Sequence, residues 1–197
     1  EYGTVYRNEL SGTLAGLLRV RMLQMNDAHI YCTADQLEEE LSQVISLTKE
    51  YLDMFGLTDY YFRLSLWSPE HKEKYIDLPH AWEMSQNTLR KILKNLDIPF
   101  QEAEDEAAFY GPKVDLQFKS VLGREESLST VQLDFLAKER FKLSYIDSNG
   151  SENNEVYVIH RAPLSTHERF MAFLIEHFGG NFPLWLSPVH VRIAPVG

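Results

Sequence analysis

The chain has 197 residues, 44% of them hydrophobic and 12% aromatic, which is enough for one compact domain with a real core. Its formal net charge of −10 argues against a dedicated nucleic-acid-binding module, because such modules usually present a basic face. The single cysteine, Cys32, excludes an internal disulfide framework, and no signal peptide, transit peptide or long apolar run is visible, so we expect a soluble cytoplasmic protein with no membrane contact.

The N-terminal stretch alternates with a period of two and predicts three short strands, over 3–9, 17–25 and 28–33. Their charged side chains share faces in small groups: Arg7 with Glu9, Arg19 with Leu23, and His29 opposite Cys32. Arginine suits planar, bidentate contacts with phosphate or carboxylate, although a solvated sheet with scattered charges remains the alternative. Because the chain begins inside a strand pattern, we interpret it as a piece of a longer protein.

The rest of the chain alternates between helical and strand periods. Capping-box patterns at Thr33–Gln36 and Ser165–Glu168 predict two helix starts. Three amphipathic helices are predicted, over 33–56, 80–96 and 165–180, and five further strands, over 60–67, 114–118, 130–135, 156–161 and 189–196. Strands outnumber helices and several are joined locally, which predicts an α+β fold with a mainly antiparallel sheet flanked by helices.

Several short segments resemble one known family. The segments YRNE (6–9), RVR (19–21) and NDAHIYC (26–32) resemble motif 2 of the class II aminoacyl-tRNA synthetases, and most closely the threonyl members. The same resemblance continues, in the same order, through AFYGPK (108–113), TVQLDF (130–135), IHRA (159–162), HERF (167–170, motif 3) and FPLWL (182–186). It implies that residues 1–197 are part of the catalytic core, with motif 1 upstream and the anticodon-binding domain downstream.

The resemblance implies an ATP site that uses Mg²⁺. Arg7 corresponds to the motif 2 arginine that holds the α-phosphate and the amino-acid carboxylate, and Arg169 to the motif 3 arginine on the γ-phosphate. The start of a helix is also a favourable place for phosphate. The remaining positions implied for ATP are Glu9, Arg19, Leu23 and Gln132.

The resemblance also implies a threonine site and a catalytic zinc ion. Threonine-binding positions correspond to Arg7, Asp27, Tyr110, Lys113 and Gln132, and two zinc ligands to His29 and His160. The third ligand of the family, a cysteine, is expected upstream of Glu1. Cys32 is the local alternative, but the spacing His29-x-x-Cys32 puts the two side chains on opposite faces of a strand, so we expect Cys32 in the core.

The implied activity is the ATP-dependent conversion of threonine to threonyl-adenylate and its transfer to the 3′ end of tRNA(Thr), by a protein that is a homodimer at full length. Four positions depart from the family's usual residues: Leu23, Met25, Ser127 and Ser165. They keep open a second hypothesis, a catalytically inactive paralogue that binds a nucleotide, an amino acid or a partner.

Overall fold

A computed structural model describes residues 2–71, 73–120 and 123–196, so Glu1 and Gly197, the predicted limits of the core segment, lie outside the described residues. The strands are β1 (Gly3–Tyr6), β2 (Met22–Met25), β3 (Ala28–Cys32), β4 (Tyr60–Ser65), β5 (Phe100–Ala103), β6 (Lys113–Lys119), β7 (Glu125–Asp134), β8 (Tyr145–Ile146), β9 (Glu152–Asn153) and β10 (Tyr157–Ala162). The helices are α1 (Leu37–Phe55), α2 (Pro79–Asn95), α3 (Ala137–Phe141) and α4 (His167–Phe178), with 3-10 turns at Ser11–Thr13 and Leu184–Leu186.

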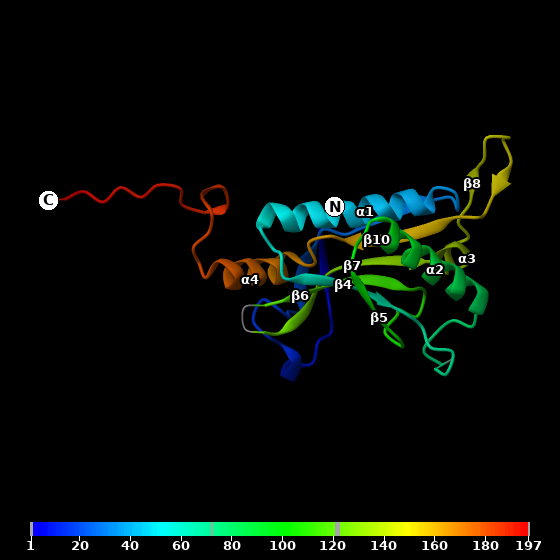
Figure 1. Cartoon of the computed structure of the whole chain (residues 1–197), viewed down its shortest axis with the longest axis horizontal. Helices are drawn as coiled ribbons and strands as arrows, with labels where there is room; N and C mark the ends of the chain where they lie inside the picture. Colours follow the sequence, from blue (N-terminus) through cyan, green and yellow to red (C-terminus); the bar gives the residue numbers. More distant parts are fainter. Residues whose placement is uncertain (1, 72, 121–122, 197) are drawn as a thin grey trace.

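The main sheet has six strands within the described residues, in the order β3-β10-β7-β6-β4-β5. Neighbouring strands are antiparallel except for β4 and β5, which run parallel because α2 connects them. Figure 1 shows the strands side by side, with helices flanking the sheet. The predicted α+β fold with a mainly antiparallel sheet is therefore confirmed.

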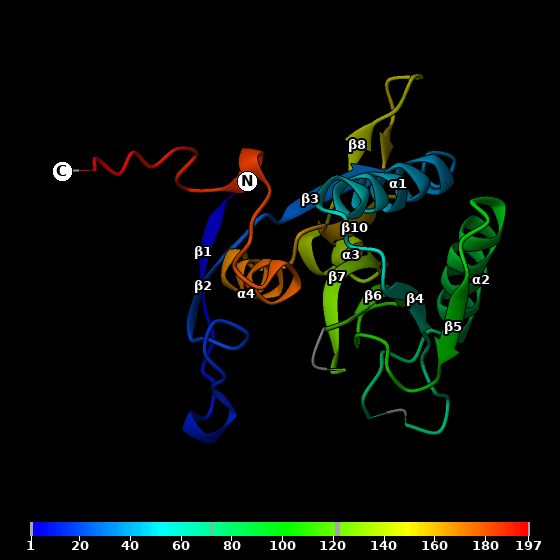
Figure 2. The same cartoon turned by 60° about the vertical axis from the view of Figure 1, so that its left-hand side comes forward.

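The two faces of the sheet have different roles. Apolar side chains on one face pack against α1, α2 and α4, the helices seen around the sheet in Figure 2. This core includes Phe62, Leu64, Val114, Leu116, Val131, Leu133 and Ile159 from the strands. Because side chains alternate along a strand, the intervening polar residues point to the opposite face. That polar face carries Arg63, Lys113, Asp115, Thr130, Gln132, Asp134 and His160.

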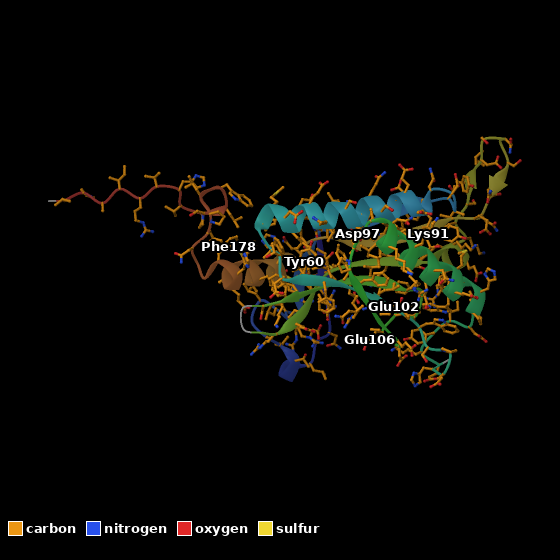
Figure 3. All side chains as sticks on the ribbon, viewed as in Figure 1. Tyr60, Lys91, Asp97, Glu102, Glu106 and Phe178 are labelled. Carbon is orange, nitrogen blue, oxygen red and sulfur yellow. The ribbon has the colours of Figure 1, made fainter. Side chains whose placement is uncertain are left out.

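Helices α1 and α2 form as their periodicity predicts. Leu41, Ile45 and Leu52 of α1 are fully buried, and α1 ends at Gly56, which has a φ of 67°. Thr48 interrupts the apolar stripe but is also buried, because its hydroxyl donates to the Val44 carbonyl at 2.9 Å. Where α2 lies beside α1, Lys91 Nζ is 2.7 Å from Glu38 Oε2, a surface pair that contributes little stability (Figure 3).

The N-terminal strands differ from the prediction. β1 and β2 are only four residues each and form a separate two-stranded sheet within the described residues, whereas β3 joins the main sheet. The predicted second strand is shortened because residues 15–19 form a turn, with Gly16 at a φ of 50°. The strands predicted over 3–9 and 17–25, which include Arg7 and Arg19, therefore do not belong to the main sheet. Both arginines belong to the hairpin segment between β1 and β2.

Other boundaries differ as well. The capping box predicted at Ser165–Glu168 does not form, because Thr166 is the N-cap and its hydroxyl accepts from the Arg169 backbone N–H. The strand predicted over 189–196 was wrong, since the described part of this segment is exposed and has no strand pairing. β5 and α3 were not predicted, as each is too short to show a clear period.

Gly111 fixes the approach of the preceding segment to β7. A Cβ atom at this position would lie 1.7 Å from the Leu133 carbonyl oxygen, so no larger residue fits without moving backbone. We expect Gly111→Ala to lower the free energy of unfolding by about 1–3 kcal/mol or more. The midpoint of denaturant unfolding measures this. Gly12→Ala is the control, because the same added atom meets nothing within 4 Å, and equal midpoints for the two variants would contradict the packing argument.

Candidate functional site

A cavity of about 330 Å³ opens where the hairpin, the polar face of the sheet and the start of α4 meet. Its lining is mostly polar and comes from segments far apart in the sequence. The lining residues are Arg7, Met25, Asp27, Tyr110, Ser127, Leu128, Ser129, Thr130, Gln132, His160, Arg161, Ala162, Ser165 and Thr166. Five of the predicted site residues are among them: Arg7, Asp27, Tyr110, Gln132 and His160. Residues predicted for ATP, threonine or zinc from distant parts of the sequence therefore converge on one cavity.

Tyr110 and Gln132 form a hydrogen-bonded pair at the cavity wall. The Tyr110 hydroxyl donates to the Gln132 side-chain oxygen, and the close approach of Gly111 to β7 holds the two residues together. Burial, followed by the charges of Asp134 and Asp27, raises the pKa of Tyr110 to about 12. The phenol therefore stays protonated at neutral pH. Its one hydrogen is donated to Gln132, which leaves the phenol oxygen as a possible acceptor in the cavity.

His29 and His160 face each other across neighbouring strands. They are direct partners in the β3–β10 register, and their ring centroids are 4.4 Å apart with an interplanar angle of 78°. His160 Nε2 lies 3.0 Å from Asp134 Oδ2. Burial raises the pKa of Asp134, but the His160 contact and the amides of Leu136 and Ala137 together lower it below its usual range. An ionised carboxylate only accepts, so Nε2 donates and the free lone pair of His160 is on Nδ1.

The histidine pair fits part of a zinc site. Imidazoles are common zinc ligands, and a carboxylate that hydrogen-bonds the second ring nitrogen is the usual way to orient them. Within residues 2–71, 73–120 and 123–196 there is no cluster of three or more His, Cys, Asp or Glu that could hold a metal ion. The described residues thus supply two ligands. Cys32 is in the apolar core, as predicted, and burial raises the pKa of its thiol to about 11.

Arg169 lies at the start of α4, deeper than a surface arginine. Its Nε donates to the Leu18 carbonyl at 3.0 Å. Burial lowers the pKa of Arg169, the nearby carboxylates of Glu126 and Glu9 raise it, and the charges of Arg7 and Arg19 lower it. Arginine remains protonated despite such shifts. The positive charges of Arg7, Arg19 and Arg169 therefore act on one another, and Arg7 is the one of the three that lines the cavity.

The other residues predicted for ATP occupy the hairpin segment. Arg19 Nε is 3.0 Å from Glu9 Oε2, so these two side chains pair with each other in this structure. Arg7 is exposed, and its Nη2 lies 3.8 Å from the Met25 sulfur. Leu23 is only 3% exposed and does not line the cavity, so its side chain offers little surface to an adenine ring in this conformation.

Lys113 belongs to a buried charge network beneath the cavity. Its Nζ lies 2.8 Å from Asp115 Oδ2, and Asp115 is only 1% exposed. The hydroxyls of Ser65 and Thr130 each donate to Asp115 at 2.9 Å, and Arg63 lies 3.4 Å away. Asp115 was not predicted as a site residue. The one signal in the sequence is that Asp115 lies within an alternating strand. A charged residue that is buried there must be paired with polar or charged groups.

Two more carboxylates near the site were not given roles by the sequence. Asp134 is two residues from Gln132 on β7, so the two side chains share a face of the sheet. On that face Asp134 contacts His160. Glu168 was read as half of a capping box, but it accepts a backbone N–H from β2 instead. Neither contact has a local signal, because each joins segments that are distant in the sequence.

Three of the four unusual positions line the cavity: Met25, Ser127 and Ser165. Ser165 has a φ of 59°, in the left-handed region that glycine adopts most easily. By the resemblance, the family usually has a glycine at this position, and the positive φ explains why glycine is favoured there. Neither His29 nor His160 is among the four departures.

Comparison with known proteins settles the family. The family model of the tRNA synthetase class II core domain (G, H, P, S and T) matches residues 1–178. The chain belongs to this family. Its relatives include the threonine–tRNA ligase of Oceanobacillus iheyensis, 53% identical, and that of Acholeplasma laidlawii, 49% identical. Each match covers 100% of this chain and 30% of the relative, so the chain spans less than a third of their length.

Solved structures of the family have the same architecture. The RNA binding domain of threonyl-tRNA synthetase from Cryptosporidium parvum matches with a TM-score of 0.85 at 36% identity, over 94% of this chain and 46% of that chain. A putative threonyl-tRNA synthetase from Aeropyrum pernix gives 0.81 at 33%, over 95% and 43%. None of the described helices has the length and apolar character needed to cross a bilayer.

Proposed function

We propose that this chain is the motif 2 to motif 3 part of the catalytic core of a threonine–tRNA ligase. The full-length protein would activate threonine with ATP and transfer it to the 3′ end of tRNA(Thr). The observation that carries this proposal is the single cavity that gathers Arg7, Asp27, Tyr110, Gln132 and His160. The similarity of the whole chain to threonine–tRNA ligases supports the choice of amino acid.

Adenylate formation is the in-line attack of a carboxylate on the α-phosphate, and enzymes accelerate it mainly by positioning and by stabilising charge. We assign Arg7 to the α-phosphate and the threonine carboxylate. Arg169 takes the γ-phosphate, where its own charge and the start of α4 act together. Arg19, Glu9, Leu23 and Gln132 stay predictions for the rest of the nucleotide, with Mg²⁺ bound by the phosphates.

The threonine end is assigned to the polar face of the sheet. Tyr110 is protonated and donates its hydrogen to Gln132, so its oxygen is left to accept from the substrate, and Asp27 can accept from the ammonium group. Lys113, held by Asp115, remains a prediction for the carboxylate side. A zinc ion held by His29 and His160 with a third ligand from outside this chain would supply a Lewis acid that distinguishes the threonine hydroxyl from the methyl group of valine.

We also propose that the full-length protein is a cytoplasmic homodimer that binds the acceptor end of tRNA(Thr). The net charge of −10 on this chain is consistent with an RNA grip located mainly on other domains. Motif 1 and the anticodon-binding domain are expected outside residues 1–197.

Pyrophosphate exchange tests the activity directly. We expect the full-length protein to exchange pyrophosphate into ATP when threonine is present and to show little exchange with valine. The competing function is an inactive paralogue, which is favoured by the position of Met25, Ser127 and Ser165 on the cavity wall. ATP binding without any threonine-dependent exchange would establish the paralogue and exclude the ligase.

A further inference from the structure

The β1–β2 hairpin is tied to the rest of the protein through the start of α4. Within the described residues it forms its own sheet and pairs with no strand of the main sheet. Met25 forms an isolated antiparallel bridge with Thr166. The Arg169 guanidinium donates to the Leu18 carbonyl at 3.0 Å. A two-stranded ribbon is marginally stable alone, so its position depends on contacts of this kind.

Glu168 makes the third of these contacts. The Gln24 backbone N–H donates to both carboxylate oxygens of Glu168, at 3.1 and 3.3 Å. Gln24 is in β2, and its backbone N–H points to the edge of that strand that is not paired with β1. This N–H therefore has no partner within the hairpin. The helix does not need Glu168 as a cap, because Thr166 already fills that role.

The Gln24–Glu168 contact lies between two groups of residues that are proposed to bind ATP. The hairpin segment carries Arg7, Glu9 and Arg19, whereas Arg169 follows Glu168 directly on the helix. The charges of Arg7, Glu9 and Arg19 all act on Arg169, so the hairpin residues lie close to Arg169. A phosphate chain held from both sides requires a fixed separation between them.

We propose that Glu168 is a positioning residue for ATP, because its carboxylate fixes β2 to α4 and thereby sets the separation between the hairpin arginines and Arg169. This inference rests on the proposed function, since ATP is the ligand that both groups would hold. Gln132 and His160 are on strands of the main sheet, and Tyr110, in the turn before β6, is hydrogen-bonded to Gln132, so none of the three depends on this contact. Of the hairpin residues, Arg7 alone is also assigned to threonine, so the loss of the Glu168 contact should affect ATP more than threonine.

Kinetics of the full-length protein test the proposal. In pyrophosphate exchange, Glu168→Ala is expected to raise the KM for ATP about tenfold, which is the effect of losing one hydrogen bond to a charged group. The KM for threonine should rise by a clearly smaller factor, because Arg7 is the hairpin residue assigned to threonine. Glu168→Gln keeps an oxygen that can accept from Gln24, so it should restore most of the ATP affinity. Equal changes in the two KM values, or a glutamine variant as impaired as alanine, would overturn the proposal.

Hydrogen exchange gives a second readout that does not need catalysis. Backbone amides of the peptide over 17–25 should exchange faster in Glu168→Ala than in the wild type, while peptides from β6 and β7 stay protected. Glu176→Ala, on the last turns of the same helix, is the matched control and should leave both regions unchanged. If the wild type lacks pyrophosphate exchange, the proposed function fails, and unchanged hairpin exchange in Glu168→Ala would separately refute the positioning role.

Discussion

Replacing Arg7 with alanine in the full-length protein is expected to lower the single-turnover rate of adenylate formation by about 10²–10³-fold. Negative charge on the α-phosphate oxygens grows in the transition state, and loss of one donor aimed at such charge typically costs about 3–4 kcal/mol. Arg7 lines the cavity and is exposed, so its removal leaves no buried gap that would unfold the protein. Rapid-quench measurement of adenylate under saturating ATP and threonine gives the rate.

Two further variants sharpen this experiment. Arg7→Lys keeps the positive charge but loses the planar fork, so it should fall between the wild type and Arg7→Ala. Arg21→Ala removes a second arginine of the same segment, whose side chain donates to the Glu9 carbonyl and to Ser11 within the hairpin loop. It should cost less than Arg7→Ala. A loss of tenfold or less for Arg7→Ala would be too small for a group that contacts the reacting phosphate.

Replacing His160 with alanine is expected to abolish tight zinc binding in the full-length protein. Removing one of three protein ligands lowers metal affinity by orders of magnitude, and the Asp134 carboxylate would lose the imidazole that it orients. The variant should also lose its preference for threonine over valine in pyrophosphate exchange. Metal analysis after dialysis against a weak chelator measures the first effect. The 197-residue chain, with His29 and His160 as its two proposed ligands, should bind zinc weakly or not at all.

The control for the metal experiment is His190→Ala, because His190 is exposed in the C-terminal segment. It should retain the zinc content and the threonine preference of the wild type. If the wild-type protein, purified with zinc available, contains no zinc, then His29 and His160 have a structural role. Selection of threonine would then require another explanation.

Much of the fold could be predicted because its elements have local signals. The apolar stripe of α1, the alternation of Val114, Leu116 and Phe118 in β6, and the strand ending in His160 were all readable from period alone. The separate hairpin was not predictable in this way. Residues 17–21 alternate like a strand, but the turn at Gly16 pairs Arg19 with Ala15, and only the Arg21 carbonyl accepts from Arg7 just after β1. Tertiary contacts with α4, and not local preference, decide where β2 lies.

The candidate site shows the same division. The resemblance identified Arg7, Tyr110, Gln132 and His160, and the structure brings these residues to one cavity. It did not identify the carboxylates that support them. Asp115, Asp134 and Glu168 act through Lys113, His160 and the hairpin, respectively, and each contact crosses between elements. Residues that touch the ligand have signatures in a motif, whereas residues that hold them in place are found by geometry.

The strand order also determines when the cavity can appear during synthesis. Within the described residues, β3, near the start of the chain, is paired in the main sheet with β10, which is made much later. The Gln24–Glu168 contact joins residues 144 positions apart. Loop-closure entropy must be lost before such distant contacts form. On the ribosome, β3 must therefore wait for its partner strand, and the hairpin for its contact with α4, until residues 157–168 have been made. A nascent chain that stops before β10 would expose an apolar strand edge, which is the kind of surface that chaperones bind and that aggregates.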